Sequence, residues 1–141
     1  MLLWDLFINT KTKMTKKIVK ILRWIWEFPQ CLLGIVLINL YKAQYISTYK
    51  KIDFYITDRM KGGISCGIYV ILHKELYANK NNILHEWGHT KQSLYFGWLY
   101  LPIIGLHSGI HALLHSKVCR KLQKYIHYWT EKWANKLGGI K

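Results

Sequence analysis

The segment from His85 to His89 holds the side chains best suited to chemistry, since it reads His-Glu-Trp-Gly-His. Helical residues four apart share one face, so the two imidazoles can bind one metal ion. Zinc binds imidazole nitrogens and prefers a tetrahedral shell. Glu86 would lie beside the ion and take a proton from zinc-bound water, as in HExxH peptidases. The alternative is a His-Glu-His face with a purely structural role.

A catalytic zinc also needs a third protein ligand and one open position. The extended pattern with a third histidine is excluded, because Gln92 and Tyr95 occupy its glycine and histidine positions. After position 80 the only acids are Glu86 and Glu131. A third ligand from the later helix would therefore be Glu131. The alternative for Glu131 is a surface pair with Lys132.

Glu131 falls within a helix predicted over residues 118–137. Its apolar stripe includes Trp129 and Trp133, and Glu131 lies off that stripe. The face around Glu131 also carries Tyr128, Ala134, Asn135 and Gly138. Small residues on this face permit the close approach of another helix.

HExxH followed by a glutamate on a later helix resembles the arrangement of gluzincin peptidases. The segment Glu131–Asn135 resembles the ExxA(D) motif of the membrane-linked CAAX prenyl protease and HtpX-like peptidases. The segment His85–Ser93 is similar to the HE(Y/W)GHxxQS segment of small uncharacterised bacterial proteins, and the likeness extends to Gly62–Ser65 and residues 128–139. The resemblance implies a zincin-like α+β fold.

The same resemblance implies Zn²⁺ ligands at His85, His89 and Glu131, with Glu86 as the base. One position departs from the pattern: Asn135 stands where the family usually has an aspartate that orients a zinc histidine. An amide oxygen can still accept the histidine N–H, but it polarises the ring less.

Two further groups of residues are candidates for the site. His127 or Tyr128 could donate a hydrogen bond to the oxyanion that forms during peptide hydrolysis. A histidine at every fourth position, His107, His111 and His115, could form a second metal site. The alternative is that these three are polar residues lining a hairpin or packed beside the active site.

The charge of the chain points to an anionic partner. Lys and Arg number 21 and Asp and Glu 7, which gives a formal net charge of +14. Such an excess is typical of proteins that meet anionic lipid or nucleic acid. No nucleic-acid-binding pattern accompanies it, and the seven Trp and ten Tyr favour a membrane surface. We expect a protein associated with the cytoplasmic side of a membrane; the alternative is a cytoplasmic one.

The first half of the chain predicts helix and then sheet. A helix over residues 18–46 should be kinked at Pro29. Its uncharged part, residues 28–41, could be a buried core helix or a membrane anchor. Residues 44–73 predict two or three antiparallel strands, with a turn at 58–63 where Gly62 and Gly63 supply backbone freedom.

The second half predicts mainly helix. A helix over 82–96 should begin at Asn81 or Asn82 and stop at Gly97. Residues 92–116 hold no charged residue, which suits a membrane-embedded or buried hairpin. The last helix should end at Gly138-Gly139. The three cysteines, Cys31, Cys66 and Cys119, indicate small buried side chains in a reducing compartment.

These expectations describe one zincin-like domain over residues 1–141, in which residues 1–17 are flexible or dispensable. It would hydrolyse peptide bonds with Zn²⁺, acting on a peptide or protein laid along an edge strand near residues 64–70. The rival is a non-enzymatic, basic, membrane-binding protein whose HExxH segment is structural or inactive.

Overall fold

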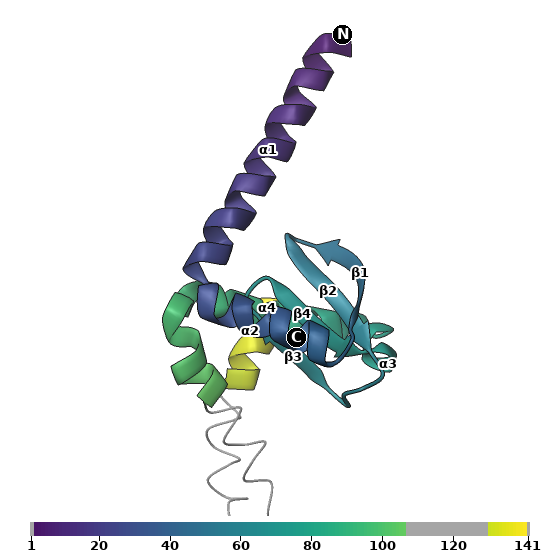
Figure 1. Cartoon of the computed structure of the whole chain (residues 1–141), viewed down its shortest axis with the longest axis vertical. Helices are drawn as coiled ribbons and strands as arrows, with labels where there is room; N and C mark the ends of the chain where they lie inside the picture. Colours follow the sequence, from purple (N-terminus) through teal and green to yellow (C-terminus); the bar gives the residue numbers. More distant parts are fainter. Residues whose placement is uncertain (1, 107–129, 141) are drawn as a thin grey trace, which may run out of the picture.

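The computed structural model describes residues 2–106 and 130–140, with side chains from residue 14 onward. Two helices, α1 (Leu2–Trp26) and α2 (Phe28–Leu40), precede a small sheet, and helix α4 (Lys80–Phe96) follows it. α2 and α4 both pack against strands of the sheet, while α1 extends away from it (Figure 1). The α+β class expected from the sequence is confirmed.

The two N-terminal helices meet at a sharp bend of 97°. Pro29 lies in the first turn of α2, where its missing N–H costs no helical hydrogen bond. The predicted kink is therefore confirmed. The bounds differ from those expected: helix extends back to Leu2 and ends at Leu40, where Lys42 with a φ of 47° turns the chain into the sheet.

The sheet contains β1 (Gln44–Tyr49), β2 (Ile52–Thr57), β3 (Gly63–Cys66) and β4 (Tyr69–His73) in the order β1-β2-β4-β3. β1–β2 and β3–β4 are antiparallel pairs, whereas β2 and β4 run parallel. The prediction of a wholly antiparallel sheet is therefore wrong. The physical reason lies in β4, whose Val70, Ile71 and Leu72 are all buried. A strand covered on both faces takes an interior position, so β4 inserts beside β2 and leaves β3 at the edge.

The apolar run from Ile64 to Leu72 is two strands rather than one. Gly67 separates them with a φ of 63°, a conformation that suits glycine. The turn over residues 58–63 lies where expected, between β2 and β3. Gly62 and Gly63 are not in the left-handed φ region, so the expected reason for these glycines is wrong; Gly63 is needed for space, as shown below.

The core is formed by the sheet together with residues of α2, α3 and α4 that pack against it. Its buried cluster is made of Cys31, Ile52, Phe54, Ile68, Val70 and Leu72. Cys31 and Cys66 are free and buried, and burial raises the pKa of their thiols to about 11 and about 12. They behave as the small buried side chains expected; Cys119 lies outside the described residues.

The helix that carries the HExxH segment begins earlier than expected. Its N-cap is Asn79, whose Oδ1 accepts the backbone N–H of Asn81 at 2.9 Å, so neither Asn81 nor Asn82 is the cap. A single turn, α3 (Lys74–Tyr77), immediately precedes it. Gly97, with a φ of 51°, ends α4 as predicted.

After α4 the chain makes a 3₁₀ turn, η1 (Gly97–Leu99), and a π-helical turn, η2 (Leu101–Gly105). The hairpin expected over residues 92–116 is therefore described only as far as residue 106. Residues 130–138 are helical and end at Gly139, whose φ is 79°, as predicted. Backbone bonds from Gly139 N to Lys136 O and from Ile140 N to Asn135 O close this end.

Candidate metal centre

Two helices cross at very close range to form the centre. A Cβ atom on Gly88 of α4 would lie 2.0 Å from the carbonyl oxygen of Ala134. A Cβ on Gly138 would lie 2.3 Å from the carbonyl oxygen of Leu84. Helix 130–138 therefore rests directly on the backbone of α4, and this contact requires glycine at both positions. The close approach expected from the small residues around Glu131 is confirmed.

The crossing brings Glu131 to the two histidines. Nε2 of His85 lies 3.2 Å from Nε2 of His89. Glu131 Oε2 lies 2.9 Å from His85 Nε2 and 3.5 Å from His89 Nε2. Two imidazole nitrogens and one carboxylate oxygen thus converge on one point, as the sequence predicts. This donor set fits Zn²⁺, which binds histidine and carboxylate in sites with three protein ligands.

Both histidines are oriented by hydrogen bonds from their second ring nitrogen. Nδ1 of His85 donates to Oδ1 of Asn135 at 2.7 Å, so the Asn135 amide orients this ring. Nδ1 of His89 donates to Oε1 of Gln92 at 2.8 Å. In a neutral ring, a protonated Nδ1 leaves the Nε2 lone pair free. The two amides therefore turn Nε2 of both rings toward Glu131.

Gln92 was not among the predicted site residues. Its Nε2 donates to the backbone oxygen of Thr130 at 2.8 Å, and its side chain is fully buried. It joins His89 to Thr130 of the helix that carries Glu131. The sequence feature that could have identified Gln92 is its spacing from His89, because a residue three positions after a helical histidine can reach the histidine ring.

Glu86 lies on the sheet side of the centre. It is only 8% exposed, and the Ser65 hydroxyl donates to its Oε2 at 2.5 Å. A Cβ on Gly63 would lie 2.2 Å from Glu86 Oε1. Strand β3 therefore passes directly against this carboxylate, which explains the glycine. Ser65 was also missed as a site residue, since its strand register could not be derived from the sequence.

The ligand charges stabilise one another. The hydrogen bond to Glu131 raises the pKa of His85 to about 9, although burial alone would lower it. Burial would lower the pKa of His89 too, but the bond to Glu131 and the charge of Glu86 reverse the direction. Burial raises the pKa of Glu131, but its bonds with both histidines hold it well below the usual range. In the metal-free protein the protonated histidine rings stabilise the Glu131 carboxylate. A bound dication would replace the ring protons and stabilise the carboxylate instead.

Tyr100 is a further residue near the acids that the sequence did not single out. It is buried, and burial raises the pKa of its phenol far above the usual range. The charges of Cys66, Glu86 and Glu131 act in the same direction, so the phenol stays neutral. The predicted oxyanion donors, His127 and Tyr128, lie outside the described residues, as do His107, His111 and His115.

A buried polar network also holds α4, through Thr90 and Ser93. Arg23 pairs with Glu27 and also donates to the backbone oxygen of Thr90 at 2.7 Å. The Ser93 hydroxyl donates to Glu27 Oε1 at 2.5 Å, and Gln30 Nε2 donates to Ser93 Oγ at 3.0 Å. The bend between α1 and α2 is thereby attached to the metal-site helix, one turn beyond His89.

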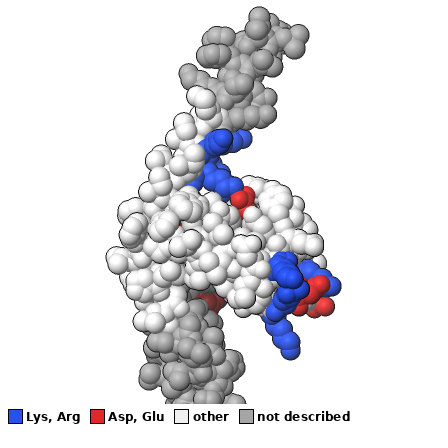
Figure 2. Space-filling model, viewed as in Figure 1, with Lys and Arg blue, Asp and Glu red and all other residues white. Residues whose placement is uncertain are grey.

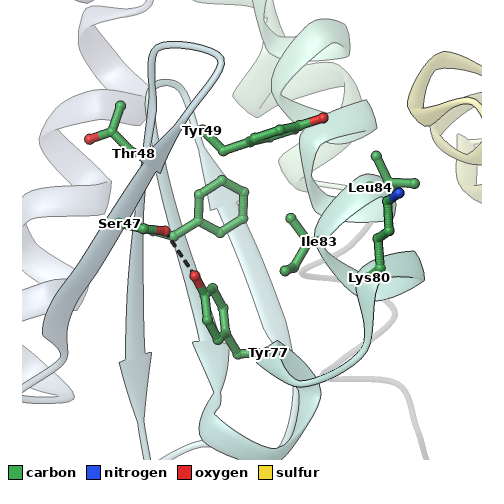
Figure 3. A pocket seen from close by; sticks show the side chains of 8 residues that line it. Ser47, Thr48, Tyr49, Tyr77, Lys80, Ile83 and Leu84 are labelled. Carbon is green, nitrogen blue, oxygen red and sulfur yellow. Dashed lines mark hydrogen bonds between the residues drawn. The ribbon is translucent and has the colours of Figure 1, made fainter.

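A separate cleft of about 320 Å³ lies between β1 and the start of α4 (Figure 3). Tyr77 and Ser47 join across it through their hydroxyls at 2.9 Å. The lining is mostly apolar and contains none of the three candidate ligands. The cleft is therefore distinct from the metal centre.

Comparisons with known proteins add no assignment. No protein-family model matches the chain, and neither the curated proteins nor the solved structures contain a significant match.

Proposed function

We propose that this protein is a zinc-dependent hydrolase of peptide bonds. The observation that carries the proposal is the convergence of His85, His89 and Glu131, with the Glu86 carboxylate close enough that its charge raises the pKa of both histidines. An ordinary helix face does not need two amides to orient two histidines toward one carboxylate. A hydrogen bond from the ring nitrogen that faces away from the metal is typical of metal-binding histidines.

The residues of the centre have different roles in the proposed reaction. His85, His89 and Glu131 would hold a zinc ion, which when bound polarises a peptide carbonyl and acidifies water. Glu86 accepts the proton of the attacking water and later passes it to the leaving amine. The Ser65 hydroxyl keeps the Glu86 carboxylate in place through its hydrogen bond.

The position of β3 supports a peptide as the substrate. β3 is an edge strand, and Gly62 O accepts the backbone N–H of His73 in β4. Because hydrogen bonding alternates along an antiparallel pair, the backbone groups of Gly63 and Ser65 point away from β4. An extended peptide can pair with such an edge. It would then run past the Glu86 carboxylate, against which Gly63 is packed.

The experiment combines zinc content with hydrolysis. The purified protein should hold about one zinc per chain and cleave an unstructured polypeptide such as casein. Glu86→Gln should keep the zinc and lose at least about 100-fold in rate, because the base is removed. His89→Ala should lose both. Glu75→Gln is the matched control, since the Glu75 side chain is 81% exposed.

Three results would contradict the proposal. Equal zinc content in the wild type and His89→Ala would exclude the ligand assignment. Hydrolysis that persists unchanged in Glu86→Gln would exclude Glu86 as the base. Zinc that is bound without any hydrolysis would favour the rival, a non-enzymatic protein with an inactive HExxH segment.

A further inference from the structure

Helix α1 presents its apolar side to solvent. Met14, Ile18, Ile21, Leu22 and Ile25 follow helical spacing along one stripe, and all are exposed. The charged side of the same helix turns inward. A surface helix of a water-soluble protein normally has the opposite arrangement, so the exposed stripe of α1 requires an apolar partner.

The inward charges of α1 are paired with residues of the protein. Lys20 forms an ion pair with Asp53 of β2 at 2.5 Å, and Arg23 pairs with Glu27. Figure 2 shows Lys and Arg of α1 on the side facing the sheet and white surface on the opposite side. These pairs fix the rotation of α1 about its axis, so the apolar stripe cannot turn inward.

Helix α2 continues the apolar surface. Leu32, Val36 and Leu40 are exposed at successive turns, while Cys31 and Gly34 face the core. α2 contains no charged residue. The surface over α2 is correspondingly white in Figure 2.

Aromatic residues join these surfaces to the end of α4 at the bend. The Trp98 indole donates to the backbone oxygen of Ile25 at 3.2 Å, and its ring lies 6.2 Å from that of Phe28. The Trp26 indole donates to the backbone oxygen of Leu94 at 2.8 Å. We use the term outer apolar face for the exposed side chains that these contacts connect: Met14, Ile18, Ile21, Leu22, Ile25, Trp26, Phe28, Leu32, Val36, Leu40, Leu94, Trp98 and Leu99.

We propose that the outer apolar face binds a bilayer that contains anionic phospholipid. Trp26 and Trp98 stand on this face, and tryptophan favours the membrane interface. The chain carries a net charge of +14, which suits an anionic surface better than a second copy of a cationic chain.

The hydropathy of the helices agrees with this assignment. Among the described residues, no single helix has the length and apolar character needed to cross a membrane. The bent pair Met14–Trp26 and Phe28–Leu40 meets the requirement only when its halves are taken together. These are the two helices that form most of the outer apolar face. The proposal does not depend on the zinc site.

Flotation of the full-length protein with lipid vesicles tests the proposal. The wild type should float with vesicles of phosphatidylcholine and phosphatidylglycerol, and more weakly with phosphatidylcholine alone. The variant Leu22→Glu/Val36→Glu changes side chains that are 61% and 53% exposed, so the fold should persist. Its vesicle affinity should fall about tenfold or more.

A matched variant controls for the added charge. Tyr45→Glu/Ile46→Glu alters two side chains on β1 that are 57% and 42% exposed but lie off the outer apolar face. It should bind vesicles like the wild type, as should Glu86→Gln. Circular dichroism establishes that each variant is folded.

The proposal fails if the wild type does not float, or if the Leu22→Glu/Val36→Glu variant floats as well as the wild type. Equal binding to neutral and anionic vesicles would exclude the preference for anionic lipid. A wild-type dimer that ignores vesicles and dissociates in the same variant would assign the face to a second copy of the chain. If the Leu22→Glu/Val36→Glu variant keeps the zinc content of the wild type, its loss of vesicle binding does not come from damage to the zinc site.

Discussion

Replacing Gly88 with alanine tests whether the helix crossing positions the third ligand. The added Cβ would lie 2.0 Å from the carbonyl oxygen of Ala134, whereas carbon–oxygen contacts are normally no shorter than about 3.3 Å. The helices must therefore separate by roughly 1.3 Å. Zinc–ligand distances tolerate a change of about 0.2 Å, so Glu131 would no longer reach an ion held by His85 and His89.

The expected result is a large loss of zinc affinity with a small change in stability. Losing a ligand position should weaken zinc binding on the order of 100-fold. Crowding costs about 1–3 kcal/mol of unfolding free energy, but alanine in a helix recovers about 1 kcal/mol relative to glycine. The net loss of stability in the metal-free protein should therefore be about 0–2 kcal/mol.

Competition with a chromogenic chelator measures the zinc affinity, and thermal unfolding of the metal-free protein measures the stability. Gly62→Ala is the control, because a Cβ at Gly62 meets nothing within 4 Å. Wild-type zinc affinity in Gly88→Ala would refute the idea that this crossing sets the position of Glu131. An equal loss in Gly62→Ala would show that the effect is not local.

Three further predictions follow from the buried contacts. Glu27→Ala should lower the unfolding free energy by about 3 kcal/mol in urea titrations, because it leaves the largely buried Arg23 charge without its carboxylate partner, whereas the exposed Glu75→Ala should have little effect. Gln92→Leu should keep the fold but weaken zinc binding about 10–100-fold, because the His89 ring loses its acceptor; an unchanged dissociation constant would contradict this. In the metal-free protein the contribution of His85 to stability is fully present below pH 6.5 and is lost as the pH rises through about 9. The contribution of Glu131 to stability is present above pH 4.5 and is lost as the pH falls below it. The melting temperature of the metal-free protein should therefore be highest near pH 4.5–6.5. A stability optimum above pH 9 would exclude the pairing of His85 with Glu131.

The features that depend on neighbouring residues could be predicted from the sequence. His85 and His89 share a helix face because helical geometry places residues four apart together. Pro29 bends the chain because it cannot continue the hydrogen bonding of the preceding helix. Gly97 and Gly139 end helices because each adopts a positive φ that other residues rarely accept. Each of these follows from local backbone chemistry.

Glu131 is an intermediate case. Its selection as the third ligand depended on the lack of other acids after Glu86 and on a motif resemblance. The small residues Ala134 and Gly138 correctly indicated a close helix contact. The partner of that contact, Gly88, lies between the two histidines but was not assigned a role. Small residues show that a helix can approach another closely. The position of the contact can be predicted only when the contacting surface of the second helix is also known.

The remaining features were decided by tertiary structure. The parallel pairing of β2 and β4 arises because the chain passes to β3 at the sheet edge and reverses at Gly67 before β4 returns beside β2. The apolar pattern of these strands fits either direction of pairing. Ser65 meets Glu86 only because β3 takes the edge position beside α4. The outer apolar face exists because Lys20 and Arg23 find acidic partners inside the protein and thereby turn the apolar stripe of α1 outward. A sequence shows that a side chain can form a hydrogen bond or an ion pair, whereas the partner is chosen by the packing of segments that are distant along the chain.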